Sequence, residues 1–293
     1  MRQPRALSIG ESVVDIYPDC RIVAGSPVHV AAHLVAMGWA VTLATRVGQD
    51  ADAARIRETL RRYGIPEDAV ESDPLLPTGS VTIHLHGDGH SFHIHKPAAW
   101  DALALHEAPP ADVVVFGSLI GRSPVARSAL GRLLAQDFRM RVFDANLRPP
   151  DVHIETVRLG LEAATVMKVS DDELSEVARV IEVPADGRSL FDYASELQWI
   201  AVTRGGRGAE LWHRSGRSWS HPGGRVKIID TVGAGDAFTA GLVHGLWSGV
   251  TGDEALAMAA DAAESILGQR GGLPPLDQLR SAAIAPQRFD EVR

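Results

Sequence analysis

The stretch of the sequence that points most directly to chemistry is residues 230–238, which read DTVGAGDAF. Gly233 and Gly235 open an apolar helix predicted over residues 234–247, and a helix start carries unpaired N–H groups and partial positive charge. Those amides can hold an anion such as a phosphate, and Asp236 beside them can take a proton from an attacking hydroxyl group. The alternative is that Asp236 only caps the helix, which requires no ligand.

Other common phosphate-binding motifs are absent from the sequence. Its three lysines, at positions 96, 168 and 227, do not follow a glycine as in G-x-x-x-x-G-K-[ST]. No HRD or DFG tripeptide of protein kinases occurs, and no G-x-G-x-x-G follows the first predicted strand. The glycine turn at residues 233–235 therefore remains the candidate anion site.

Composition and charge narrow the class of protein. The chain has 293 residues, of which 45% are hydrophobic and 23% charged, as in soluble globular proteins. A net charge of -8 without a basic cluster argues against nucleic acid and acidic membrane surfaces. The apolar residues 6–14 are interrupted by Glu11, unlike a signal peptide, and a single cysteine, Cys20, excludes an internal disulfide. We expect a soluble, cytoplasmic protein that binds neither nucleic acid nor membranes.

Short apolar runs alternate with amphipathic segments along the chain. This alternation predicts an α/β fold whose mostly parallel central sheet carries helices on both faces. We expect residues 1–293 to form a single domain, and the helix that begins at Ser26 to use Ser26 as its N-cap. The predicted strands are 5–9, 41–47, 112–116, 141–143, 166–169 and 200–203, and the predicted helices are 26–37, 50–63, 124–136, 154–163, 171–180 and 234–247.

Residues 80–95 do not follow this alternation of strands and helices, and they read SVTIHLHGDGHSFHIH. Apolar and polar residues alternate on both sides of Asp88-Gly89, which predicts a β-hairpin with its turn at these two residues. Such a turn places apolar residues opposite each other on one face and histidines on the other. The predicted pairs are Leu85 with Phe92, Ile83 with Ile94, and His84 with His93.

Residues 78–98 and the extended stretch 11–25 are predicted to form a small β-sheet beside the main one. Open α/β sheets bind ligands at the carboxyl ends of their strands, and a flap leaving the first strand would cover that site. We therefore expect the small sheet to act as a lid. Its apolar face must pack against the substrate cleft, its own neighbouring strands or a second subunit, so the lid is also a candidate homodimer interface.

At this point the sequence resembles the ribokinase-like, PfkB-type carbohydrate kinases. Residues 230–238, followed by Ala240-Gly241, match the C-terminal signature of that family. Residues 24–31 read AGSPVHVA and, with Gly38 and Gly48 at the family's spacing, nearly match the N-terminal signature. The resemblance covers essentially the whole chain. It implies a ribokinase-like fold and an ATP-dependent sugar kinase that uses Mg²⁺, with K⁺ as a further candidate cation.

The resemblance also assigns roles around the glycine turn. Asp236 would be the general base, and the backbone amides of Gly233, Ala234 and Gly235 would form an anion hole for the phosphoryl oxygens. Thr203, Gly205 and Gly208 lie in TRGGRG, which resembles the family's T-x-G-x-x-G nucleotide loop. Together with Thr231, Gly233 and Gly235 they would bind the phosphates and ribose of the nucleotide. Residues 259–272 would pack near the adenine.

Sugar-binding roles follow from the same resemblance. Asp15 would hold sugar hydroxyls, Gly25 would let the backbone approach the sugar, and His29 stands where the family usually has Asn. Asn146 and Arg148 lie in DANLRP, which resembles the D-x-N-x-R of fructokinases and 2-keto-3-deoxygluconate kinases. There Arg148 would meet a sugar-acid carboxylate or a phosphate. The alternatives are a surface aspartate, a partly buried helix histidine and a loop arginine paired with a surface acid.

Residues 168–173 read KVSDDE and resemble the family's N-x-x-E segment, with Ser170 in place of Asn. The resemblance implies that Glu173 positions Mg²⁺ through water. The alternative is structural, because S-x-x-E is a capping box that starts a helix.

Two rival functions stay open beside a sugar kinase. One is a nucleoside kinase with the same fold, and the other is a non-catalytic sugar- or nucleotide-binding protein that kept the fold. The D-x-N-x-R sequence favours sugars or sugar acids, and the intact GAGD favours catalysis.

Overall fold

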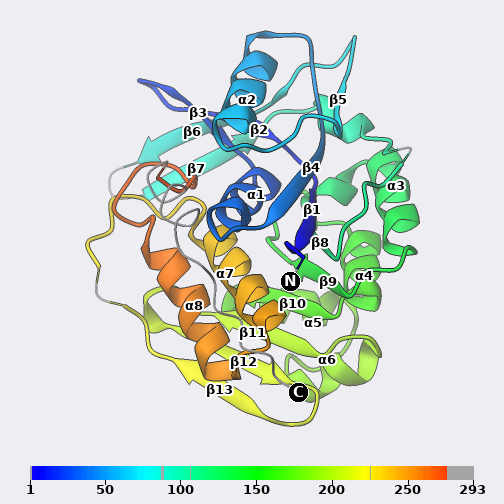
Figure 1. Cartoon of the computed structure of the whole chain (residues 1–293), viewed down its shortest axis with the longest axis vertical. Coiled ribbons are helices and arrows are strands. Elements are labelled where there is room, and N and C mark those ends of the chain that lie inside the picture. Colours follow the sequence, from blue (N-terminus) through cyan, green and yellow to red (C-terminus); the bar gives the residue numbers. More distant parts are fainter. Residues whose placement is uncertain (1, 87–88, 106, 225, 276–293) are drawn as a thin grey trace.

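A nine-stranded sheet forms the centre of the computed structural model, which describes residues 2–86, 89–105, 107–224 and 226–275 (Figure 1). The first seven strands run parallel to one another, and the last two pairings, of the seventh strand with the eighth and of the eighth with the ninth, are antiparallel. The predicted fold class is confirmed. In spatial order the strands are β5 (Val70–Ser72), β4 (Ala40–Val47), β1 (Arg5–Ile9), β8 (Val113–Gly117), β9 (Met140–Asp144), β10 (Val166–Ser170), β11 (Trp199–Thr203), β12 (Ala209–His213) and β13 (Ser218–His221).

Helices cover both faces of this sheet, because alternate residues of its central strands are apolar on opposite sides. In β8, Val114 and Phe116 belong to one buried cluster, whereas Val113 and Val115 belong to another. The first cluster includes α3 (Pro124–Leu134), α4 (Ile154–Ala163), α5 (Asp171–Val180) and α6 (Gly187–Tyr193), and the second includes α1 (Ser26–Ala36), α2 (Ala51–Arg62), α7 (Ala234–Ser248) and α8 (Gly252–Glu264).

Among the described residues, no helix combines the length and apolar composition needed to cross a membrane.

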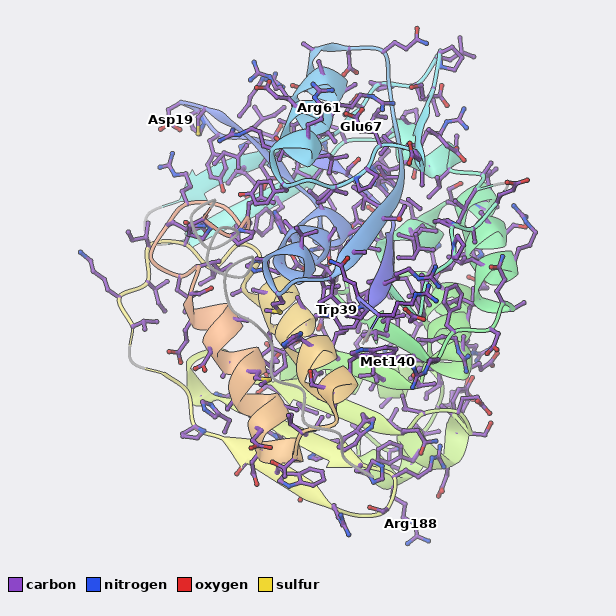
Figure 2. All side chains as sticks on the ribbon, viewed as in Figure 1. Asp19, Trp39, Arg61, Glu67, Met140 and Arg188 are labelled. Carbon is purple, nitrogen blue, oxygen red and sulfur yellow. The ribbon has the colours of Figure 1, made fainter. Side chains whose placement is uncertain are left out.

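Helices α1 and α7 pack side by side, although they lie about two hundred residues apart in the chain (Figure 1). Trp39, labelled in Figure 2, follows α1 and donates its indole N–H to His244 Nδ1 of α7 at 3.0 Å. The same indole contacts the ring of Trp247, with ring centroids 5.5 Å apart. These contacts fix one end of the helix pair, and the opposite ends meet at the carboxyl edge of the sheet.

The start of α1 differs from the prediction. Its N-cap is Gly25, with a φ of 113°, and Ser26 is the first helical residue. A Cβ at position 25 would lie only 2.5 Å from the carbonyl oxygen of Glu11, so the close approach requires glycine there. Because Ser26 does not cap the helix, its hydroxyl is available to the groups at the strand ends.

The small sheet contains four strands in the order β3 (Arg21–Ala24), β2 (Val13–Ile16), β6 (Gly79–His86) and β7 (Gly89–Ile94). Strands β2 and β6 are parallel, and the other two pairs are antiparallel. Its buried face contains Val13, Tyr17, Ala24, Val81 and Ile83. Side chains of β2 and β3 thus share this apolar face with those of β6, and Val13, Ala24 and Val81 of this face also line the cavity described below.

The pairing within the hairpin differs from the prediction by two residues. Ile83 lies opposite Phe92 and Val81 opposite Ile94, whereas His84 lies opposite Ser91. His86 pairs with Gly89, so the turn is centred one residue earlier than predicted; the predicted turn residue Asp88 lies outside the described residues. Glycines flank Asp88 on both sides, so turn chemistry alone does not choose between the two positions. A shift of two residues keeps the same side chains on each face.

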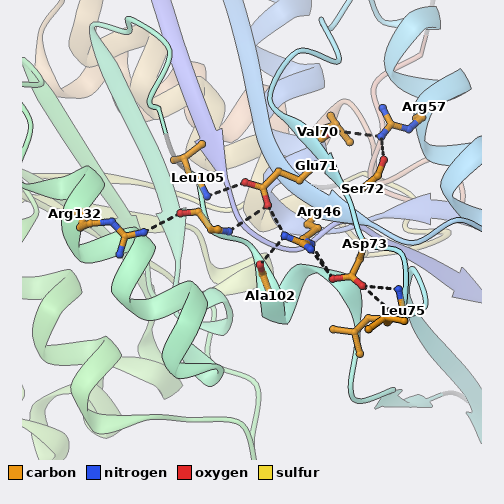
Figure 3. Close-up of polar contacts among 12 residues, drawn as sticks. Arg46, Arg57, Val70, Glu71, Ser72, Asp73, Leu75, Ala102, Leu105 and Arg132 are labelled. Carbon is orange, nitrogen blue, oxygen red and sulfur yellow. Dashed lines mark hydrogen bonds and ion pairs between the residues drawn. The ribbon is translucent and has the colours of Figure 1, made fainter.

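A cluster of ion pairs and hydrogen bonds holds the segment between β5 and β6 against the main sheet (Figure 3). Arg46 of β4 donates to Asp73 Oδ2 at 2.9 Å, to Glu71 Oε2 at 3.1 Å and to the Ala102 carbonyl at 3.2 Å. The other oxygen of Asp73 accepts the backbone N–H groups of residues 75 and 76, both at 2.8 Å. The segment that leads into β6 is thus held by a residue of the rigid central sheet.

Candidate active site

The carboxyl ends of the parallel strands meet the N-terminus of α7 and the small sheet around a cavity of about 350 Å³, here called the first cavity. The small sheet contributes Val81, Phe92 and Ile94 to its wall. All five residues predicted to bind substrate line it, namely Asp15, Gly25, His29, Asn146 and Arg148, and so do Thr231, Gly233, Gly235 and Asp236 of the glycine motif.

A second cavity, of about 240 Å³, lies on the other side of the glycine motif. Its walls are mainly apolar and include the exposed Ile228 and residues of α8. Of the residues predicted to bind nucleotide, Thr203, Gly205, Gly208, Thr231 and Gly235 line it, whereas Gly233 lines only the first cavity. Ala234, predicted as part of the anion hole, lines the second cavity as well. Thr231 and Gly235 line both cavities, so the two spaces meet at the first turn of α7.

The first turn of α7 is built for bare backbone amides. Gly233 is its N-cap in the left-handed conformation, with a φ of 79°, and a Cβ there would collide with the backbone of Gly272. A Cβ on Gly235 would lie 2.9 Å from the Nζ of Lys168. Gly233 and Gly235 therefore present backbone without a side chain, whereas the amide of Ala234 donates to the Thr231 carbonyl at 3.2 Å, and an ammonium group lies beside the turn. Both features suit an anion.

Lys168 was not predicted as a site residue, because a lysine inside a strand carries no motif. Its Nζ lies 3.2 Å from Asp144 Oδ1, while Thr239 of α7 donates to Asp144 Oδ2 at 2.7 Å. Burial works against the charged form of Lys168, but Asp144, Glu173 and Asp236 outweigh burial and raise its pKa. Lys168 therefore stays a cation at the anion site and, through Asp144, connects the strand ends to α7.

Asp236 is buried, with 8% of its surface exposed, and its Oδ2 lies 2.8 Å from Nδ1 of His29. Burial alone would raise the pKa of Asp236. Its interaction with His29, together with the hydroxyl of Ser26 and the nearby Lys168, outweighs burial and lowers that pKa. The carboxylate is therefore ionised at neutral pH and can accept a proton.

Two further carboxyl groups line the first cavity. Burial raises the pKa of Asp15 to about 6, with His29 opposing and Asp230 adding to the effect. Burial also raises the pKa of Glu11 to about 7. Sequence reasoning did not select Glu11, because its burial depends on α1 and the lid closing over the end of β1. Both groups can exchange hydrogen bonds with a polyol near neutral pH.

The loop after β9 brings Asn146 and Arg148 to the first cavity. Asn146 has a φ of 38°, a conformation that asparagine tolerates better than most residues. Arg148 is exposed and donates to the Leu147 carbonyl at 3.1 Å. Within the described part of the chain it forms no ion pair, so the predicted alternative of a surface acid partner is not observed.

Glu173 forms the predicted capping box and lines neither cavity. Its Oε2 accepts the backbone N–H and the hydroxyl of Ser170, both at 2.9 Å, and its Oε1 accepts the backbone N–H of Leu147 at 2.6 Å. Both oxygens thus hold backbone at the ends of β9 and β10. Its contact with Mg²⁺ through water stays a prediction.

Comparisons with known proteins agree with this geometry. The family model described as pfkB family carbohydrate kinase matches residues 21–279. A fructokinase of Escherichia coli is 29% identical over 269 residues, which cover 84% of this chain and 86% of that protein. A fructokinase of Vibrio cholerae O395, solved with fructose, ADP and calcium ion, shares 25% identity with a TM-score of 0.80 over 95% of this chain and 98% of that one. A sugar kinase of Pyrococcus horikoshii, solved with ATP, shares 23% identity with a TM-score of 0.81 over 94% and 99%.

Proposed function

This chain belongs to the pfkB family of carbohydrate kinases, and from that premise we propose that it transfers the γ-phosphoryl group of ATP to a hydroxyl of a small sugar or sugar acid. The acceptor is fructose-like or 2-keto-3-deoxygluconate-like. The observation that carries this proposal is the meeting of two cavities at Thr231 and Gly235, directly beside the buried Asp236.

In this proposal the sugar occupies the first cavity and ATP the second. Asp15 and Glu11 hold sugar hydroxyls, and Arg148 at the cavity mouth meets a carboxylate or phosphate. The glycine-rich loop of Gly205 and Gly208 and the apolar wall of the second cavity bind the nucleotide. The Vibrio cholerae relative, which binds fructose and ADP together, supports this division.

The reaction step uses the residues at the junction. The acceptor oxygen attacks the γ-phosphorus while its proton passes to Asp236, and the bond to the β-phosphate oxygen breaks to leave ADP. The amides of residues 233–235 and the ammonium of Lys168 stabilise the negative charge on the transferring group. Closure of the lid sheet excludes water, which limits ATP hydrolysis.

Mg²⁺ fits this site as a companion of ATP rather than as a resident metal. Within the described residues no group of three or more His, Cys, Asp or Glu side chains is arranged to hold a metal ion. Mg²⁺ usually binds through substrate phosphates and waters with one or two carboxylates, so this side-chain set suffices, and the ion would neutralise phosphate charge. Glu173 is the carboxylate that we propose for a contact through water. K⁺ is a second candidate cation, and its concentration can be varied in the ADP-release assay described next.

The experiment is ADP release with ATP and a panel of acceptors: fructose, ribose, 2-keto-3-deoxygluconate and adenosine. We expect one of the sugars or the sugar acid to raise ADP release far above the rate without acceptor. Stimulation by adenosine alone would instead make the protein a nucleoside kinase, and no stimulation by any acceptor would favour a binding protein. The relatives reported above do not favour either alternative.

A further inference from the structure

His29 and Asp236 form a buried pair between α1 and α7. Nδ1 of His29 lies 2.8 Å from Oδ2 of Asp236, across 207 positions of sequence. The two residues are only 3% and 8% exposed. The prediction gave His29 a sugar-binding role in place of the family's usual Asn. In the structure His29 lines the first cavity, and its ring also contacts the residue that we propose as general base.

The surroundings of the two ring nitrogens decide where the imidazole proton lies. An ionised carboxylate can only accept hydrogen bonds, so the nitrogen that faces Asp236 must donate. The other nitrogen, Nε2 of His29, is buried and has no hydrogen-bond partner among the described residues. A proton there would be an unsatisfied buried donor. Both observations place the proton on Nδ1, with Asp236 as its acceptor.

We propose that His29 is a positioning residue for Asp236, fixing the carboxylate through an Nδ1–H···Oδ2 hydrogen bond and favouring its ionised form. The proposal rests on the function proposed above, in which Asp236 accepts the proton of the sugar hydroxyl. In that step His29 keeps its own proton, and only Asp236 changes protonation state. The hydrogen bond is strongest while the carboxylate is charged, so it prepares the base before proton transfer.

Other charged or titratable groups face Asp236 or His29 from neighbouring elements. Those that interact with Asp236 are Lys168 of β10, Asp144 of β9, Glu11 after β1 and His33 of α1, and Asp15 of β2 interacts with His29. All of them stay in place when position 29 alone is changed. Because His29 also lowers the pKa of Asp15, the profiles are compared in an Asp15→Asn background, where a remaining shift of the acid limb is assigned to the contact between His29 and Asp236.

His33 supplies a matched control, because it lies one turn further along the same helix and is equally buried. Its Nε2 lies 3.0 Å from the carbonyl oxygen of Gly272, which can only accept. Burial, the larger effect, lowers the pKa of His33 to about 4, so His33 is neutral at pH 7. His33 therefore carries its proton on Nε2, the opposite nitrogen from His29.

The first test is the pH dependence of kcat/KM for three variants. His29→Leu removes the hydrogen-bond donor to Asp236. A hydrogen bond to a charged group contributes about 1.5–3 kcal/mol, which corresponds to about one to two pKa units. We therefore expect the acid limb to move up by about one to two pH units. His29→Asn should restore most of the wild-type profile, because its amide nitrogen is as many bonds from Cβ as Nδ1. His33→Gln should leave the acid limb in place. An unchanged acid limb in His29→Leu would overturn the proposal.

The second test does not depend on activity. A long-range ¹H–¹⁵N spectrum of the two imidazoles should show Nδ1 protonated in His29 and Nε2 protonated in His33. In Asp236→Ala the Nδ1 proton signal of His29 should be lost while His33 is unchanged. A proton on Nε2 of His29 in the wild type would refute the hydrogen bond. Absence of kinase activity on every acceptor would refute the proposed function, whichever tautomer is found.

Discussion

Glu11→Gln should make the protein more stable at alkaline pH and change little at acidic pH. Glu11 lies two residues after the end of β1, is 6% exposed and lines the first cavity. Burial is the main cause that raises the pKa of its carboxyl group from 4.5 to about 7, and Asp236 adds to it. The backbone hydrogen bond, Arg148 and Arg122 act in the opposite direction. The folded protein therefore holds a proton on Glu11 that the unfolded chain has lost.

The sign and size follow from linkage. Between pH 4.5 and about 7 the folded state binds more protons than the unfolded state, so Glu11 lowers the free energy of unfolding as pH rises through this window. The pKa difference corresponds to about 3 kcal/mol once pH exceeds both values. A glutamine side chain has nearly the same shape as the protonated side chain of Glu11, but it does not titrate. The variant should thus gain about 2–3 kcal/mol relative to wild type between pH 5 and pH 8.

Urea unfolding followed by tryptophan fluorescence at pH 5 and pH 8 measures this gain. Glu58→Gln is the matched control, because Glu58 lies on the exposed face of α2 and its replacement should change stability by less than about 0.5 kcal/mol. A difference between Glu11→Gln and wild type that is the same at both pH values would refute the reasoning. Asp15 also titrates in part of this range, and it is unchanged in both proteins.

Three further predictions concern the binding sites. Asp15→Ala should weaken sugar binding on the order of ten- to a hundredfold and leave ATP affinity unchanged in separate calorimetric titrations; equal sugar affinity would remove Asp15 from the site. Gly208 has a φ of 94° and no room for a Cβ beside the His221 carbonyl, so Gly208→Ala should lower both the Tm and ATP affinity, and unaltered ATP affinity would remove this loop from the nucleotide site. The β6–β7 hairpin should exchange amide hydrogens more slowly with sugar bound, whereas equal exchange with and without sugar would argue against a lid.

Much of the fold was predictable because the sequence patterns that specify helices and strands lie within short segments of the chain. The alternation of apolar strands and amphipathic helices predicted α4 and α5 at their observed bounds, and the capping box at Ser170 and Glu173 forms as predicted. The site was predictable in outline for a related reason. Parallel strands end at one edge, so polar residues that follow different strands must lie near each other.

What the sequence did not reveal depends on contacts between distant segments. The hydrogen bond between His29 and Asp236 spans 207 positions, and the burial of Glu11 requires α1 and the small sheet to pack over it. The antiparallel strands β12 and β13 and helix α8 were also not predicted as such. The strand Ser218–His221 is short and partly exposed, so it lacks the apolar signal of the central strands.

The most direct test of the central claim is turnover of Asp236→Asn with its best acceptor. We expect kcat to fall by about a hundred- to ten-thousandfold, as on loss of a general base, while ATP still binds to the unchanged amides of residues 233–235. Asp253→Asn is the control, because Asp253 is likewise an acid in the first turn of a helix, α8, but lies outside both cavities. If Asp236→Asn behaves like Asp253→Asn, with near-normal kcat and a small loss of stability, Asp236 is only a helix cap and the account is wrong.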